Sequence, residues 1–333
     1  IAMTSLTGYA QIWGIKGPDQ SFSTPRIWRL FKFRADGTSI QAVGDITLDG
    51  QPVKVDALAY APQYGLVAFQ RDGSLYEYTA SNSRLVRIDP QTARVTVLGE
   101  WISGHSIVGA AFDLVGQLWA LDVLQDALLR IDPDTGTVLQ SVPIISDGSF
   151  LNLRDGDIAF DLYGNAYIND TIPQQPYGSR FYWVNLNTGV ATLLHTDWRN
   201  VLGCSSIGPA IAGLAFSRAA PPGRLFVMQH NCDDNIWYYD IDHDWNRVYL
   251  YDLWSESRGG YNSGLGDLAS SMSCAEHNGD VNNNGCVDDA DLLAVLFAFG
   301  QTGSDLGLVD VNCDEVVDDA DLLVVLFNFG SGC

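Results

Sequence analysis

The chain has 333 residues, 47% of them hydrophobic, and a formal net charge of −22. This acidity disfavours binding to nucleic acid or to an anionic membrane surface, because both need a basic protein face. No run of 18 apolar residues occurs, so we expect no membrane-spanning helix. Residues 274–333 hold 12 acidic residues and no Lys or Arg, and every Trp and Tyr precedes residue 274. We therefore expect two domains, over residues 1–272 and 273–333.

The first domain contains a repeat with a period of about 50 residues. Each copy shows four short apolar stretches with turn residues between them, and Arg-Ile-Asp-Pro occurs at residues 87–90 and again at 130–133. First strands are expected at residues 57–61, 107–113, 156–161, 211–217 and 265–269. Such a repeat resembles the blade of a β-propeller of the quinoprotein or NHL-like kind.

The two ends of this domain are incomplete in complementary ways. The expected strands at residues 9–15, 27–33 and 39–43 lack a first strand, and the strand at 265–269 lacks later ones. Pairing these remnants makes a fifth blade and removes the open sheet edges. The predicted fold is an all-β propeller of five four-stranded blades, closed by the N- and C-terminal strands.

Three tryptophans follow the outermost expected strand of a blade by a few residues: Trp101, Trp198 and Trp254. Connections from outer to inner strands emerge on one propeller face, so these side chains are expected to share it. There they would bind a carbohydrate or a protein partner. The alternative is that each Trp is wedged between two blades. Asp113 and Asp161, each followed by a turn, are interpreted as turn residues rather than catalytic ones.

Recognised catalytic motifs are missing from the sequence, and its five histidines show no metal-ligand spacing. We therefore expect a non-catalytic protein. The alternative is a carbohydrate-active enzyme, because some five-bladed propellers are glycosidases with carboxylates in the central tunnel. Asp56, Asp157 and Asp267 on the expected inner strands would then be the candidates.

The second domain contains two acidic segments 30 residues apart, at 280–291 and 310–321. Loop positions 1, 3, 5, 9 and 12 carry side-chain oxygens in both, and position 7 would supply a backbone carbonyl. Calcium takes six to eight oxygen ligands, and alternate residues of a tight loop can supply them. We predict two Ca²⁺ sites, formed by Asp280, Asn282, Asn284, Cys286, Asp288 and Asp291, and by Asp310, Asn312, Asp314, Val316, Asp318 and Asp321.

Each loop leads into an apolar helix, expected at residues 290–299 and 320–329, with Gly300 and Gly330 as C-terminal caps. The repeated Asp-Val-Asn…Asp-Asp-Ala-Asp-Leu-Leu pattern resembles a type I dockerin over residues 278–330. The resemblance implies two calcium loop–helix units related by a pseudo-twofold axis, and docking to a cohesin module. One departure is Glu315 at position 6, where the first loop has Gly285, and it predicts a weaker second site.

Both helices are too apolar to be buried on all sides in a 60-residue domain. An apolar stripe is therefore expected to remain for a partner or for the propeller. The expected docking residues are Leu292, Leu293, Leu296, Phe297, Leu322, Leu323, Leu326 and Phe327.

Six cysteines, without a Cys-x-x-Cys pair, predict disulfides in a protein outside the cell. Cys204 and Cys232 are the only candidates for a pair within the propeller. In the tail three connectivities are open, and the preferred one joins Cys274 to Cys333 and Cys286 to Cys313. Calcium loops also favour an extracellular or cell-surface location, and we expect a bacterial source.

Together these features predict a secreted, calcium-dependent binding or assembly protein. Its tail is expected to dock onto a cohesin-like module, or onto the propeller of another copy in an extracellular filament. The alternative is the glycosidase described above, attached to a cohesin scaffold.

Overall fold

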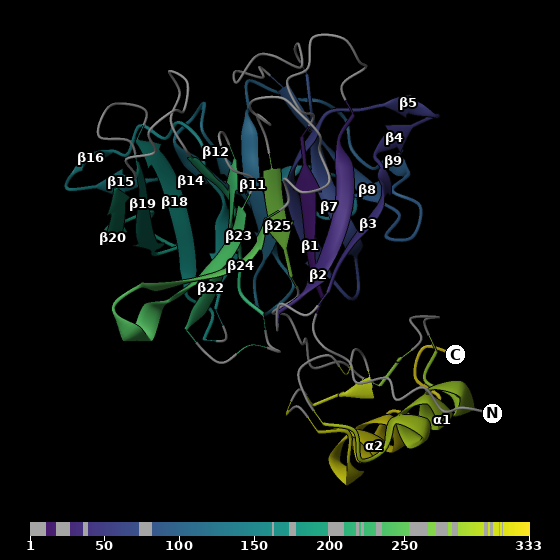
Figure 1. Cartoon of the computed structure of the whole chain (residues 1–333). Helices are drawn as coiled ribbons and strands as arrows, with labels where there is room; N and C mark the ends of the chain where they lie inside the picture. Colours follow the sequence, from purple (N-terminus) through teal and green to yellow (C-terminus); the bar gives the residue numbers. More distant parts are fainter. Residues whose placement is uncertain are drawn as a thin grey trace.

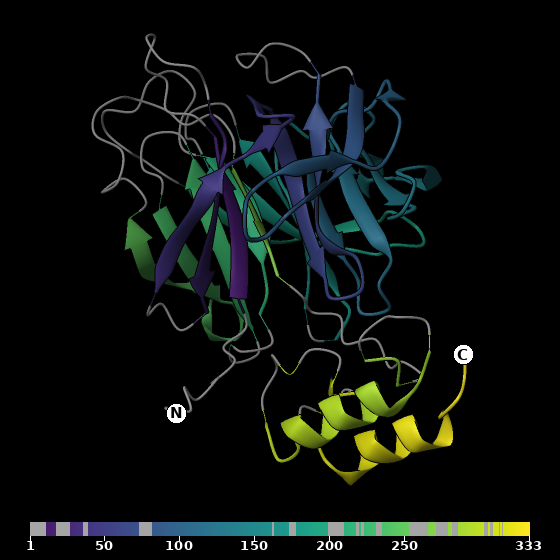
Figure 2. The same cartoon turned by 90° about the vertical axis from the view of Figure 1, so that its right-hand side faces the viewer.

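The computed structural model describes residues 11–17, 27–35, 39–72, 82–161, 163–172, 178–198, 210–217, 220, 223–230, 235–252, 266–270, 279–281, 286–302, 306, 309–312, 314 and 316–333. Five antiparallel sheets surround a central axis, and two helices lie below them (Figures 1 and 2). The predicted five-bladed propeller is confirmed. No helix in these ranges is long and apolar enough to cross a membrane.

Each blade is a meander of four strands that follow one another from the axis outward. Blade 1 consists of β25 (Gly266–Ala269), β1 (Gln11–Lys16), β2 (Arg29–Arg34) and β3 (Ile40–Asp45). Blade 2 consists of β6 (Val55–Ala61), β7 (Gly65–Arg71), β8 (Asn82–Ile88) and β9 (Val95–Val97), and β10 (Ile102–Ser103) also pairs with β8.

The other three blades follow the same order. Blade 3 consists of β11 (Ile107–Phe112), β12 (Leu118–Asp122), β13 (Ala127–Ile131) and β14 (Val138–Pro143). Blade 4 consists of β17 (Ile158–Phe160), β18 (Ala166–Ile172), β19 (Gly178–Val184) and β20 (Ala191–Trp198). Blade 5 consists of β21 (Ala210–Ala215), β22 (Arg224–His230), β23 (Asn235–Asp240) and β24 (Asn246–Asp252).

The remaining elements are short. Two hairpins connect blades, β4 (Thr47–Leu48) with β5 (Gln51–Pro52) and β15 (Ile145–Ser146) with β16 (Ser149–Phe150). A 3₁₀ turn, η1 (Ile241–His243), joins β23 to β24. The helices are α1 (Asp289–Ala298) and α2 (Asp319–Phe327), close to the predicted ranges.

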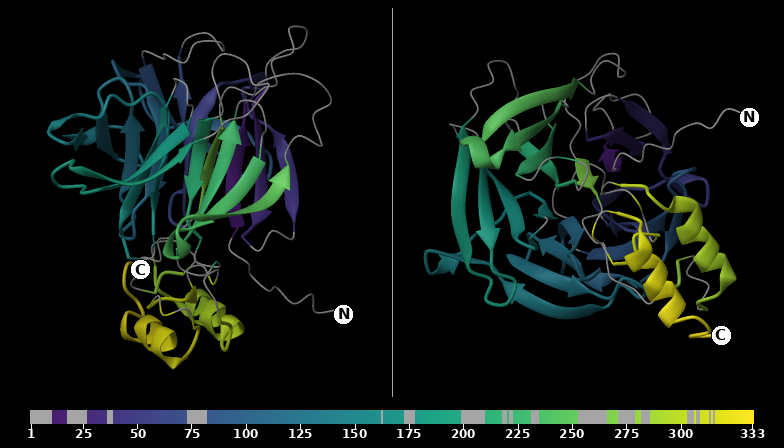
Figure 3. Two further views of the ribbon diagram at one scale, coloured as in Figure 1. Left: turned by 60° about the vertical axis from the view of Figure 1, so that its left-hand side comes forward. Right: turned by 90° about the horizontal axis from the view of Figure 1, so that it is seen from below.

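Blade 1 closes the ring as predicted from the sequence. β25 pairs antiparallel with β1, from Trp13 opposite Ala269 to Lys16 opposite Gly266. Seen from below, β25 lies near the axis, within the ring of blades (Figure 3, right). The propeller is therefore held together by a strand that lies more than 250 positions from its partner in the sequence.

The hydrophobic core is divided into five clusters, each between two neighbouring blades. Blades 1 and 2 share a cluster around Trp28 and Leu66, and blades 5 and 1 share one around Phe33 and Phe226. The other three clusters lie between blades 2 and 3, 3 and 4, and 4 and 5. A sixth cluster contains only residues of the C-terminal segment, Val281 to Val325. Burial of apolar surface therefore stabilises the contacts between blades as a ring, with a separate core for the tail.

The repeated aspartates are turn residues, as the sequence predicted. Asp113 Oδ1 accepts hydrogen bonds from the backbone N–H groups of Val115 and Gln117, at 3.1 and 2.8 Å. Asp161 does the same for Tyr163 and Asn165. These bonds fix the turn between the first two strands of blades 3 and 4.

The inner strands approach one another too closely for side chains at some positions. A Cβ at Gly213 of β21 would lie 2.6 Å from the backbone nitrogen of Leu268 on β25. We expect Gly213→Ala to lower the free energy of unfolding by about 1–3 kcal/mol, the usual cost of overpacking a core. Urea denaturation measures this change. Gly44→Ala on β3 is the matched control, because its nearest neighbours would lie at 3.7 Å, and it is expected to change stability by under about 0.5 kcal/mol. Equal losses in the two variants would contradict the close approach of blade 5 to β25.

Candidate metal-binding loops

The two acidic loops end at helices whose starts are fixed by aspartates. Asp288 and Asp318 are the N-cap residues of α1 and α2, and each accepts a hydrogen bond from the backbone N–H two residues later. The side chains of Asp291 and Asp321 reach back to the N–H groups of Asp288 and Asp318, at 2.9 Å in both loops. These capping boxes satisfy N–H groups that have no partner within the helix.

The same two aspartates also hold the beginning of each loop. Asp291 Oδ1 accepts from the backbone N–H of Val281 at 2.8 Å, and Asp321 Oδ1 accepts from Val311 at 2.6 Å. Both carboxylates are fully buried. The bond patterns match at an offset of 30 residues, so the sequence repeat is also a repeat of geometry.

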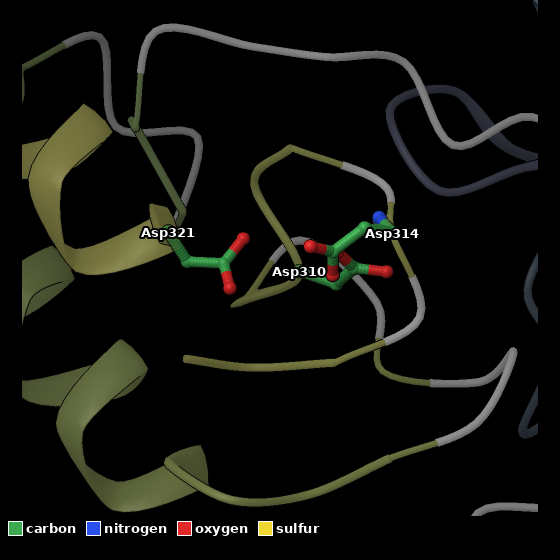
Figure 4. A group of neighbouring side chains, drawn as sticks. All are labelled: Asp310, Asp314 and Asp321. Atoms are coloured by element: carbon green, nitrogen blue, oxygen red, sulfur yellow. The ribbon is translucent and has the colours of Figure 1, made fainter. Parts of the chain in front are cut away.

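Three carboxylates of the second loop converge. One oxygen each of Asp310, Asp314 and Asp321 lies within 4.8 Å of the other two (Figure 4). Asp310 and Asp321 are buried, whereas Asp314 is exposed. Asp314 Oδ1 also accepts from the N–H of Val316, which orders the backbone at position 7. The arrangement offers a set of hard oxygen donors, of the kind that a divalent cation prefers.

Some of the predicted ligands lie outside the described residues, namely Asn282 and Asn284 of the first loop, as do Gly285 and Glu315 at position 6. Asp280, Cys286, Asp288 and Asp291 of the first loop are described, as is Asn312 of the second. Asn312 Nδ2 donates to Asp314 at 3.0 Å, so this position 3 side chain is within the cluster.

Each loop pairs with the segment that follows the opposite helix. Val317 of the second loop exchanges hydrogen bonds with Gly300 and Gln301 after α1, at 2.8 and 2.9 Å. Val287 of the first loop does the same with Gly330 and Ser331 after α2. Val287, Val317, Val295 and Val325 are all fully buried in the tail's own core. The two units are therefore reciprocal halves of one small structure.

This reciprocal pairing corrects the preferred disulfide assignment. Cys286 is bonded to Cys333, with a Cα–Cα distance of 4.6 Å, and not to Cys313. The pairing of Cys274 with Cys333 is also wrong. The reason is that Val287 brings its neighbour Cys286 beside the chain end. Cys204, Cys232, Cys274 and Cys313 lie outside the described residues.

The exposed faces of α1 and α2 match one another closely. Leu293, Leu296 and Phe297 are 49%, 46% and 83% exposed, and Leu323, Leu326 and Phe327 are 46%, 48% and 84% exposed. We call these six residues the paired apolar face. Leu292 and Leu322, expected to dock with the others, are half-buried and pack against the tail's own core. The sequence prediction missed Phe299 and Phe329, each 50% exposed just beyond the helices, although their offset of 30 residues is a visible signal.

Two of the three tryptophans are described, and both lie at the end of the sheets where the inner strands begin. Trp101 precedes β10 and is 39% exposed, with the Arg84 guanidinium 4.6 Å from its ring centre. Trp198 ends β20 and is 57% exposed. Trp254 lies outside the described residues. Part of each ring therefore lies at the surface of blades 2 and 4, with Arg84 over the ring of Trp101.

The three inner-strand carboxylates are buried. Asp56 forms an ion pair with Arg71 at 2.7 Å, and burial nevertheless raises the pKa of Asp56 to about 6. Asp157 and Asp267 are fully inaccessible and hydrogen bond to each other. All three side chains are thus enclosed by the protein rather than presented in an open tunnel.

The sequence matches no protein-family model and is not similar to any curated protein. Among solved structures, the chain is similar to one in a nidogen–laminin complex, at 12% identity and a TM-score of 0.45, over 79% of this chain and all of the other. It is also similar to a Lactobacillus plantarum protein at 10% identity and TM-score 0.39, over 73% and 82% of the two chains. A third similar structure is a catalytically inactive virginiamycin B lyase from Staphylococcus aureus, at 10% identity and a TM-score of 0.36, over 72% of this chain and 74% of the other. At such identities the comparison concerns the fold alone.

The disulfide closes a loop of 47 residues around the tail. We expect replacement of both Cys286 and Cys333 by Ser to destabilise the tail by about 2–4 kcal/mol, because the unfolded chain gains entropy. Hydrogen exchange followed by mass spectrometry would show faster exchange in α1 and α2 and unchanged exchange in blades 2 to 4. Peptide mapping without reduction checks the connectivity, and a peptide linking Cys286 to Cys313 would contradict it.

Proposed function

We propose that this protein is a secreted, non-catalytic binding protein whose C-terminal segment binds calcium and docks onto a protein partner. The proposal rests above all on the paired apolar face, since two helices with matching exposed Leu and Phe side chains present a hydrophobic surface that no other part of the described chain covers. The dockerin-like sequence pattern supports the same conclusion.

Calcium is the ion that suits the loops best. Asp310, Asn312, Asp314, Asp318 and Asp321 would supply side-chain oxygens and Val316 its carbonyl, and the first loop would use the residues 30 positions earlier. The tail has 12 acidic residues and no Lys or Arg, so a bound cation would offset the repulsion between its carboxylates. The ion would order each loop and so the start of the helix that follows.

The partner that we propose is a cohesin-like module with an apolar surface. Because the faces of α1 and α2 are alike, such a partner would bind through either helix. The partner would then localise the propeller. Trp101 and Trp198, beside the outer strands of blades 2 and 4, would bind a further ligand such as a carbohydrate. The disulfide and the calcium loops both support a location outside the cell.

Calcium binding is tested by calorimetry on the full chain. We expect two sites, and we expect Asp314→Ala to weaken one of them at least tenfold, because it removes a charged ligand at an exposed position. Asp319→Ala is the matched control, since Asp319 is exposed on the first turn of α2 but points to no predicted site. Identical binding by all three proteins would contradict the proposed ligand set.

Docking is tested by binding of the calcium-loaded chain to an immobilised cohesin module. We expect single Phe297→Ser and Phe327→Ser variants to bind within about threefold of the wild type, and the double variant to lose binding, because either helix suffices. Leu193→Ser, a half-exposed residue on blade 4, is the control and is expected to bind normally.

Light scattering with and without a calcium chelator tests the alternative partner, which is another copy of the same protein. Calcium-dependent growth of particles by the protein alone would show that another copy, and not a cohesin-like module, is the partner. Full binding by the double Phe variant would overturn the role of the paired apolar face.

A further inference from the structure

Two carboxyl groups meet at the propeller axis from blades that are not neighbours. Asp157 directly precedes β17 of blade 4, and Asp267 lies on β25 of blade 1. Both side chains are completely buried and hydrogen bond to each other. Such a bond needs a hydrogen, because two ionised carboxylates have only acceptors. One proton is therefore shared by the pair.

This carboxyl pair also binds the other blades. Asp157 accepts from the backbone N–H of Ile158 at 2.7 Å and from Leu214 of blade 5 at 2.6 Å. Asp267 accepts from Leu268 and from Leu58 of blade 2. In blade 3, Gly109 has no Cβ, and one placed there would lie 2.4 Å from Asp157 Cα. All five blades thus contact the pair directly.

The strand that carries Asp267 is the closing strand of the ring. β25 has four residues, and among the described strands its one partner within the sheet is β1. Asp267 links this strand to blades 2 and 4 at the axis, by way of Leu58 and Asp157. Ala269 and Leu268 of the same strand pack in the apolar clusters toward blades 2 and 5. Loss of the shared proton would place two negative charges side by side in a buried site, which costs far more than in water.

We propose that the proton shared by Asp157 and Asp267 makes closure of the propeller sensitive to pH. When the pair loses this proton, β25 separates from the axis. The ring then opens at its seam between blades 1 and 5, at the strand from which the C-terminal segment continues.

The neighbouring charged groups do not replace this proton. Asp56 on β6 is a further acid whose charge acts on the pair, and Arg71 of β7 forms an ion pair with Asp56 and donates to Ser106. Further groups at this end of the sheets are Lys54, Asp155 and Lys16, together with the pairs Asp170–Arg180 and Asp122–His105. The described residues of β11 and β21 carry no charged side chain, and the side chain of His230 on β22 is outside the described residues.

The direction of the pH effect follows from linkage. Burial raises the pKa of both carboxyl groups well above their usual value of 3.8, so the closed ring holds a proton that the open form releases. Closure is therefore strongest near pH 4 and weakens as the pH rises toward the raised pKa of the pair. Within that range, each pH unit favours opening about tenfold for one released proton.

Hydrogen exchange of the full chain between pH 4 and pH 9, corrected for intrinsic exchange, tests this pH dependence of ring closure. We expect the protection of the Leu268 and Ala269 amides to fall up to tenfold per pH unit over part of this range, while that of β12 falls less. In Asp267→Asn, whose side chain is neutral at every pH, the protection of β25 should depend less on pH than in the wild type. Asp161→Asn, at a blade 4 turn away from the pair, is the control and should keep the wild-type dependence.

Two results would overturn the proposal. One is a protection of β25 in the wild type that is constant with pH or parallel to that of β12, which needs no variant to fold. The other is an unchanged pH dependence of β25 in Asp267→Asn.

Discussion

The five blades of the propeller meet at the point on its axis where Asp157 and Asp267 hydrogen bond to each other and to backbone N–H groups of the neighbouring blades. A ring of five sheets needs its inner strands close together, and there the chain has a glycine in blade 3 and two aspartates whose oxygens accept backbone N–H groups of blades 2 and 5. Ala57, with a φ of 57°, adopts a left-handed conformation directly before the Leu58 N–H that points to Asp267. The polar groups at the axis are thus paired with one another, and the apolar clusters between blades form around them.

The negative charge of buried carboxylates is offset differently in the propeller and in the C-terminal segment. At the propeller axis, repulsion between two aspartates is relieved by a proton, and Asp56 is balanced by Arg71. In the C-terminal loops, Asp291 and Asp321 are equally inaccessible and also accept backbone N–H groups, but their segment contains no Lys or Arg. We expect a cation in the second case, as proposed above, since three carboxylates of the second loop converge there. On these two proposals, the same side chain would serve closure in one part and ion binding in the other.

Much of the fold was predictable because it follows from local patterns in the sequence. The strand–turn repeat located all five inner strands within a few residues, and the incomplete blades at the two ends predicted the closure by β25 and β1. The repeated loops likewise located α1 and α2. These features need only periodicity, turn chemistry and the avoidance of free sheet edges.

What the sequence did not reveal depends on contacts between distant segments. Asp157 and Asp267 were recognised as inner-strand carboxylates, but nothing local shows that two residues 110 positions apart share a proton. The Cys286–Cys333 bond was misassigned because it follows from the exchange of segments between the two halves of the tail. Similarly, Leu292 and Leu322 are as apolar as their neighbours, and only the packing of α1 against α2 turns them toward the core.

The pairing of β25 with β1 has a mechanical consequence. The chain leaves β25 at Ala269, beside Trp13 near the start of β1. Tension applied between the two ends of the propeller would therefore pull the strands apart from one end and break their hydrogen bonds one after another. Tension between the tail and the far end of the sheets would instead load β25 along its length and strain all its bonds at once. A propeller anchored through the loops at that far end would resist force on its tail better than one held by its N-terminal strand.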